Sequence, residues 1–152
     1  MRTRRRKSDM NIERARSSDL PDIQALLTQA QLPAGDLSAA ALEHFLVIRA
    51  GDEVTGAVGL EPFGTVALLR SLVVTDDLRG RGFGGALTDA AEDLARTLDV
   101  ASVYLLTTSA DAFFLSRGYR PIQRSEAPEK IRSTTQFNTL CPDSAVLMTK
   151  EV

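Results

Sequence analysis

The chain has 152 residues, of which 43% are apolar and 25% are charged. This length and apolar content fit one domain with a buried core and exclude an intrinsically disordered chain. No apolar run approaches the roughly 18 residues of a membrane span, so we expect no membrane partner. One cysteine cannot form an internal disulfide, and the basic start lacks the apolar segment of a signal peptide, so we expect a cytoplasmic protein. One histidine and one cysteine give no basis for a zinc site, and we expect no metal.

The net charge of −2 hides an uneven distribution. Residues 1–9 hold five basic residues and one acid, which leaves the remainder of the chain with a net charge of −6. Because residues 1–9 also lack apolar periodicity, we predict a disordered basic tail there and one folded domain over residues 10–152. A start codon assigned too far upstream and a nucleic-acid-binding arm both remain open for the tail. The acidic body predicts no nucleic-acid partner for the domain itself.

The first half of the chain predicts strands and short helices in alternation. Ser18 or Asp19 is a suitable cap for a helix that has Pro21 in its first turn, and a charged turn between two apolar runs predicts a hairpin. In chain order we expect a strand over 11–16, this capped helix, a short helix over 37–43, hairpin strands over 44–49 and 54–60, a turn over 62–64 and a buried strand over 66–74.

The second half predicts a helix over about 82–98 and a further buried strand over 102–106. Because a helix joins the strands over 66–74 and 102–106, we expect those strands to be parallel. Within the helix we place Asp89, Glu92 and Asp93 on the solvated side, opposite an apolar stripe. The remaining expected elements are a helix over 110–117, strands over 119–123 and 145–148, and a helix near 129–137.

The most informative segment is the glycine-rich run over residues 79–85, Arg-Gly-Arg-Gly-Phe-Gly-Gly, which follows a strand and opens a helix. Glycines allow successive backbone N–H groups to face one concavity, and a helix start favours an anion such as a pyrophosphate. The spacing Gly80, Gly82, Gly85 also fits a dinucleotide fingerprint, but the intervening residues 75–79 and the position of Asp99 argue against it. A tightly packed turn without a ligand remains open on spacing alone.

Ser71-Leu72-Val73-Val74 followed by Arg79-x-x-Gly82-x-Gly84 resembles the acetyl-coenzyme A signature of the GNAT N-acetyltransferases. The resemblance extends over residues 10–150 and includes the order of the elements. It implies an α/β (α+β) fold in which a mixed central sheet of about six or seven strands has helices on both faces. It also implies acetyl-coenzyme A (acetyl-CoA) as co-substrate, and a homodimer in many members.

The resemblance implies roles for two backbone segments. The strand backbone at Leu72, Val73 and Val74 would pair with the pantetheine arm, and amides near Val73 would stabilise the oxyanion formed when an amine attacks the thioester. The loop would hold the pyrophosphate through residues Arg79, Gly80, Arg81, Gly82, Phe83, Gly84 and Gly85.

A closer resemblance narrows the substrate. The segments 68–72, 105–108 with 113–114, and 137–145 resemble N-acetyltransferases associated with bacterial arsenic-resistance operons. The run Leu-Thr-Thr at 106–108, with the Arg-Gly-Tyr at 117–119, also resembles bacterial N-acetylglutamate synthases. Both imply that the substrate is the primary amine of a small amino acid or an amino-acid-like compound.

Five residues are candidates for the acceptor side. Glu61 is a candidate base acting through water, and a surface carboxylate is the alternative. Arg70 lies within an apolar run, which is costly unless the guanidinium is paired. It is a clamp for a substrate carboxylate, a side chain on the solvated face of the strand, or the partner of an acid. We assign Ser71, Thr107 and Thr108 to substrate binding, and for the two threonines ordinary β-propensity with hydroxyl capping is the alternative.

Phe114 occupies the position where many family members place the tyrosine that protonates the thiolate.

The sequence therefore predicts an acetyl-CoA-dependent N-acetyltransferase that acts by direct amine attack. We do not assign a covalent role to Cys141. The alternatives are an enzyme like N-acetylglutamate synthase, a non-catalytic acyl-CoA sensor and a protein acetyltransferase. A role in arsenic resistance follows only from the operon association of the resembled proteins.

Overall fold

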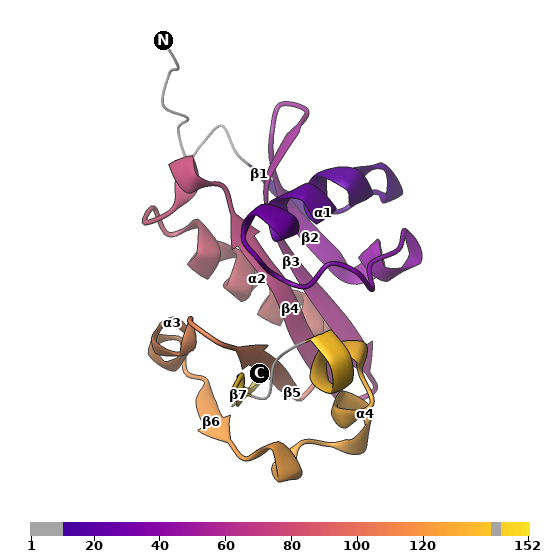
Figure 1. Cartoon of the computed structure of the whole chain (residues 1–152), viewed down its shortest axis with the longest axis vertical. Coiled ribbons are helices and arrows are strands. Elements are labelled where there is room, and N and C mark those ends of the chain that lie inside the picture. The colour runs from indigo at the N-terminus through magenta and orange to yellow at the C-terminus, as the bar shows by residue number, and fades with distance from the viewer. Residues whose placement is uncertain (1–10, 141–143) are drawn as a thin grey trace. The chain divides into compact units, whose positions relative to one another are not determined.

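A computed structural model describes residues 11–140 and 144–152 (Figure 1). The expectations for the tail over 1–9 and for Cys141 therefore lie outside the described residues. The strands form one mixed seven-stranded sheet in the order β1-β2-β3-β4-β5-β7-β6, which confirms the predicted fold class. The strands are β1 (Asn11–Arg14), β2 (Phe45–Ala50), β3 (Glu53–Phe63), β4 (Val66–Val74), β5 (Ser102–Thr107), β6 (Arg120–Ile122) and β7 (Val146–Glu151).

Helices lie between most of the strands in the described part of the chain. The α-helices are α1 (Leu20–Gln29), α2 (Phe83–Thr97), α3 (Asp111–Ser116) and α4 (Glu129–Arg132). Short 3₁₀ helices are η2 (Ser17–Asp19), η3 (Ala40–His44), η4 (Asp76–Leu78) and η5 (Arg124–Glu126), and η6 (Gln136–Leu140) is a π-helical turn.

The backbone divides into two compact units, the first over residues up to 59 with 71–91 and the second over 60–70 with 92–152. In the first unit, β1, β2 and β3 are antiparallel neighbours, and α1 packs on them. Ile23 and Leu27 of α1 are fully buried in a core with Phe45, Val47 and Ala57. The helical spacing of the α1 residues and the alternation along the strands thus bury matching faces.

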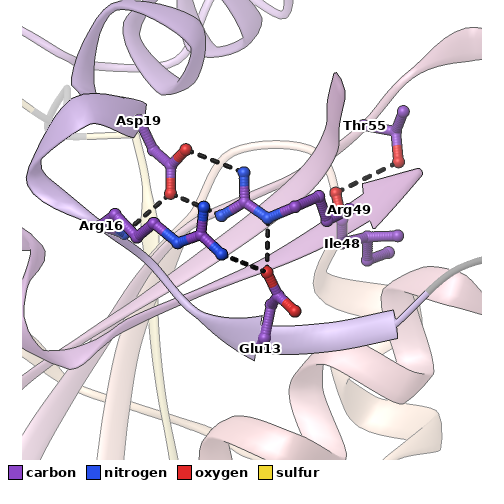
Figure 2. Close-up of polar contacts among 6 residues, drawn as sticks. All are labelled: Glu13, Arg16, Asp19, Ile48, Arg49 and Thr55. Carbon is purple, nitrogen blue, oxygen red and sulfur yellow. Dashed lines mark hydrogen bonds and ion pairs between the residues drawn. The ribbon is translucent and has the colours of Figure 1, made fainter. Parts of the chain in front are cut away.

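A charged cluster attaches the start of α1 to the sheet (Figure 2). A register shift between Ile48 and Arg49 forms a bulge in β2, and bulges redirect a side chain. Arg49 donates two hydrogen bonds to the Asp19 carboxylate, at 2.8 and 3.0 Å, and forms an ion pair with Glu13 of β1. The Thr55 hydroxyl donates to the Ile48 carbonyl oxygen at the same bulge. Asp19 occupies the N-cap position of α1, as predicted, but its side chain accepts from Arg49 and from the backbone N–H of Arg16 rather than from the helix.

In the second unit, β5 is central. Its residues Ser102–Tyr104 pair in parallel with Val66–Leu68 of β4, which confirms the parallel arrangement expected from the joining helix. On its other side β5 pairs antiparallel with β7, which in turn pairs with β6. The core of this unit contains Leu68, Ala127, Ile131 and Leu147.

Four local expectations were wrong. The helix expected over 37–43 is the 3₁₀ helix Ala40–His44, and the turn expected over 62–64 begins later because β3 runs on to Phe63. The helix expected near 129–137 is instead the short α4 followed by the separate turn η6. Glu92 is 3% exposed rather than solvated. Its carboxylate accepts hydrogen bonds from the Tyr119 hydroxyl at 2.9 Å and from Lys150 Nζ at 2.8 Å. These partners offset the desolvation cost of burying the charged group.

Candidate active site

The first site feature is an irregularity within β4. Ser71 has a φ of +61°, in the left-handed region that side chains other than glycine rarely adopt. Such a conformation costs about 1–3 kcal/mol and persists only where the surroundings hold it. It also interrupts the regular alternation of side chains between the two faces of the strand. The strained residue lies immediately before Leu72, Val73 and Val74, the segment predicted to bind pantetheine.

The second feature is the glycine-rich loop that leads into α2. Gly80 and Gly82 have φ values of +75° and +85°, so glycine is required at both positions. The Ala86 N–H donates to the Gly82 carbonyl oxygen at 3.0 Å, which places Gly84 and Gly85 in the first turn of α2. N–H groups in a first helical turn have no acceptor within the helix, so this turn suits an anion.

The two loop arginines lie in different surroundings. Arg79 is exposed and forms an ion pair with Asp76, three residues earlier, at 3.0 Å. The Arg81 guanidinium lies 5.5 Å from the centroid of the Phe83 ring and is half-buried. Positive charge is therefore present on both sides of Gly80, where the sequence predicts phosphate binding.

A cavity of about 90 Å³ joins the end of β4 to the loop. It brings together Val73, Val74 and Arg79, which the sequence assigned to the coenzyme. The rest of the lining was missed, because its residues come from the end of α1 and from the first residue of η4 with the residue before it, and they carry no motif. Those lining residues are Leu26, Gln29, Ala30, Thr75 and Asp76.

The structure brings the two charged acceptor candidates together. Arg70 is 5% exposed, and its Nη1 lies 3.7 Å from Oε2 of Glu61, whose side chain is one-third exposed. Of the interpretations left open for Arg70, a position on the solvated face is wrong and the pairing with an acid is observed. Glu61 contacts both the buried guanidinium and solvent, so it is not an isolated surface carboxylate.

The remaining candidates lie around α3. The Thr107 hydroxyl accepts the Ala110 N–H at 2.9 Å, just before α3, while Thr108 is exposed. Phe114 is 5% exposed and contacts the Phe113 and Tyr119 rings edge to face, with centroid distances of 5.0 and 5.5 Å. Burial raises the pKa of the Tyr119 hydroxyl, assisted by the nearby Glu92 carboxylate, so this phenol is a poor proton donor.

Comparison with known proteins identifies the class. A family model described as the acetyltransferase (GNAT) domain matches residues 41–121, more than half of the chain. The chain therefore belongs to the GNAT acetyltransferase family, and the family resemblance is confirmed.

An uncharacterized N-acetyltransferase of Chlorobaculum tepidum is 34% identical over 95 residues, which are 59% of this chain and 60% of that protein. The chain thus spans less than two thirds of the length of this relative. N-acetylglutamate synthase from Neisseria gonorrhoeae, solved with coenzyme A and N-acetyl-glutamate, has a TM-score of 0.82 at 20% identity, over 96% of this chain and 36% of that chain. Rv2747 from Mycobacterium tuberculosis, solved with coenzyme A and NLQ, has a TM-score of 0.77 at 22% identity, over 93% and 99% of the two chains.

The described residues contain neither a grouped set of metal ligands nor a membrane-spanning helix. Across residues 11–140 and 144–152, no three histidine, cysteine or acidic side chains are grouped to hold a metal ion. Within the same described ranges, no helix combines the length and the apolar character needed to cross a membrane.

Proposed function

We propose that the protein transfers the acetyl group of acetyl-CoA to the primary amine of a small amino acid or amino-acid-like compound. The observation that carries the proposal is the cavity that joins Val73 and Val74 to Arg79. A coenzyme with an amide-rich arm and a pyrophosphate needs a strand backbone next to an anion-binding helix start, and the first unit contains both. The family and the name of the Chlorobaculum relative support an N-acetyltransferase.

The residues present fit acetyl-CoA, which supplies the acetyl thioester when bound. The backbone of Leu72, Val73 and Val74 would align the pantetheine arm, with the strained Ser71 fixing where that segment begins. The amides of the α2 first turn and the guanidinium groups of Arg79 and Arg81 would bind the pyrophosphate. The Val73 amide is our candidate for stabilising the oxyanion.

On the acceptor side, we propose that the Arg70–Glu61 pair recognises and activates the amino compound. Arg70 would orient a substrate carboxylate, helped by the hydroxyls of Ser71, Thr107 and Thr108. Glu61, being partly exposed, would accept the ammonium proton through water, because only a neutral amine is nucleophilic.

The chemistry then requires one bond to form and one to break. The amine nitrogen attacks the thioester carbonyl carbon, the new C–N bond forms, and the C–S bond breaks to release coenzyme A as a thiolate. The nitrogen proton leaves to water or Glu61, and water protonates the thiolate in our proposal because Phe114 has no proton to donate. A thiol pKa of about 8.5 makes this assistance helpful but not essential.

Purified protein incubated with acetyl-CoA and a panel of amino acids tests the proposal by the release of free thiol. We expect turnover on at least one amine, reduced strongly by Arg70→Met. Glutamate is included because the N-acetylglutamate synthase-like alternative predicts that it is preferred. No turnover on any amine, together with no coenzyme A binding by calorimetry, would refute the proposed function.

The second candidate function is an acyl-CoA sensor that binds without catalysing transfer. The buried Phe114 at the usual position of the proton-donating tyrosine favours it. Coenzyme A binding with no thiol release across a broad panel of amines would select this candidate over the enzyme.

The cellular setting is a separate proposal. The resemblance to operon-associated proteins supports a role in arsenic resistance, and the composition supports a cytoplasmic location. Expression in arsenic-sensitive cells tests the role, with Gly82→Asp as the matched inactive variant. Equal arsenic tolerance in cells that express the wild type and in cells that express Gly82→Asp would exclude a role in arsenic resistance.

The family resemblance also supports a homodimer. Light scattering of the purified protein tests this by measuring the mass of the particle in solution.

A further inference from the structure

The end of α1 forms a wall of the cavity that the family signature does not include. Leu26, Gln29 and Ala30 occupy the last turn of this helix and the residue after it, and all three line the cavity. The end of β4 lines the same cavity through Val73 and Val74. Both walls belong to the first unit.

This wall is held firmly in place. At its start, α1 is attached to β2 through the Asp19–Arg49 pair, and in its middle the fully buried Ile23 and Leu27 pack in the core. The same core contains Val73 of β4, so one set of packed side chains fixes both walls. A ligand between them would meet an arrangement already formed, which reduces the ordering cost of binding.

The lining combines apolar, amide and charged groups, and the charged part includes the Asp76 carboxylate next to Thr75 as well as Arg79. Leu26, Ala30 and the β4 valines supply apolar carbon, and the exposed Gln29 supplies an amide that both donates and accepts hydrogen bonds. Arg79 supplies positive charge at the loop, where it is paired with Asp76. A pantetheine arm has matching parts, since it carries a dimethyl group and two amides and ends at a pyrophosphate.

We propose that the last turn of α1 is the second wall of the pantetheine site, and that the Gln29 side chain hydrogen-bonds an amide of the arm. The inference rests on the proposed function, because it names a coenzyme-binding residue for that same site. It adds a side chain from outside the signature to the pantetheine site, for which the signature supplies only the backbone of residues 72–74.

Two substitutions at position 29 test the proposal. Gln29→Leu removes the amide and keeps the bulk, while Gln29→Ala removes both, and each residue is a good helix former. Gln24→Leu is the matched control, because it makes the same change on α1 at a position outside the cavity lining. Calorimetry would compare coenzyme A with 3′-phosphoadenosine 5′-diphosphate, which carries the phosphates but lacks the pantetheine arm.

We expect both Gln29 variants to bind coenzyme A about five- to tenfold more weakly than the wild type, as for loss of one hydrogen bond. Their affinity for the nucleotide probe should be unchanged, and Gln24→Leu should match the wild type for both ligands. Unchanged coenzyme A affinity in the Gln29 variants, or an equal loss for both probes, would overturn the proposal. A wild-type protein that binds no coenzyme A would instead refute the proposed function.

Discussion

Asp19 and Arg49 form the ion pair that fixes the start of α1, and it gives stability a defined pH dependence. Hydrogen bonding from Arg49 lowers the pKa of the Asp19 carboxyl below its ordinary 3.8. Because the folded pKa is the lower one, the pair stabilises the protein above the ordinary pKa. This contribution is lost as the pH falls through 3.8 toward the folded value.

We therefore predict that Asp19→Asn lowers the free energy of unfolding by about 1–3 kcal/mol at pH 7. The difference from the wild type should shrink as the pH falls below about 4. Urea unfolding at pH 7, 5 and 3 measures both effects. Asp22→Asn, which removes an exposed carboxylate from the same helix, should have little effect. A difference between Asp19→Asn and the wild type that is constant with pH would contradict this account.

Asp76 competes with the coenzyme phosphates for Arg79 if the proposed site is correct. The two side chains form an exposed ion pair at 3.0 Å, and exposed pairs are weak. We predict that Asp76→Asn raises the affinity for coenzyme A about two- to fivefold at low salt, with the gain shrinking at high salt. Binding titrations at two ionic strengths measure this. Asp93→Asn releases Arg96 on α2 from a comparable pair, so its affinity should stay at the wild-type value.

At the level of elements, the packing of β2 against β3 depends on Gly59. A Cβ at this position would overlap the fully buried Phe45 ring, which lies directly across the strand pair. Gly59→Ala should therefore lower the unfolding free energy by about 1–3 kcal/mol. Gly35→Ala is the control, because nothing lies within 4 Å of its new methyl group. Replacing the ring with a smaller side chain in Phe45→Leu should recover part of the stability lost in Gly59→Ala, as measured by a double-mutant cycle. Strictly additive losses of unfolding free energy would argue against the contact between position 59 and the Phe45 ring.

Glu92 links α2 to β7 through Lys150 and contacts the residue before β6 through Tyr119. Lys150→Met removes one partner from a carboxylate that is 3% exposed, so we expect a loss of about 3–5 kcal/mol in unfolding free energy. Replacing both Glu92 and Lys150 with methionine removes both charges and should cost less than Lys150→Met alone. Denaturant unfolding of the two variants and the wild type measures this. A double variant less stable than Lys150→Met would show that the pair itself stabilises the fold.

Sequence patterns predicted elements where the local signal was complete. The apolar run over 66–74 gave β4 with its observed bounds, and the glycine-rich run gave the start of α2 to within one residue. They failed where partners are distant in the chain. Glu92 looked solvated because its partners lie 27 and 58 residues later, and the bulge that turns Arg49 toward Asp19 depends on strand pairing.

At the scale of the whole molecule, the sequence predicted those parts of the candidate site that are formed by the backbone. Glycines and a strand edge leave a sequence signature because few residue types tolerate the required conformations. The α1 wall leaves none, since Gln29 is an ordinary exposed helical residue until the fold places it beside Val73. The strain at Ser71 was equally invisible, because serine carries no preference for a positive φ.

Coenzyme binding should affect the molecule globally and locally in different ways. Any ligand that binds only the folded state stabilises all of it, by about 2.7 kcal/mol at one hundred times the dissociation constant. For a chain of this size that corresponds to a rise in Tm of roughly 5–10 °C. Amides that exchange through local opening, however, are slowed only where the ligand contacts the protein.

We therefore predict that saturating coenzyme A raises Tm and slows hydrogen exchange most at two segments of the first unit, residues 72–85 and the end of α1. The edge strand β6, which lies in the second unit and outside the proposed coenzyme site, serves as the internal reference. Hydrogen exchange followed by mass spectrometry, with and without coenzyme A, makes the measurement. Protection of residues 72–85 without the end of α1 would retain the loop and strand assignments but remove the α1 wall. A rise in Tm with no excess protection in either segment would place the ligand elsewhere on the chain.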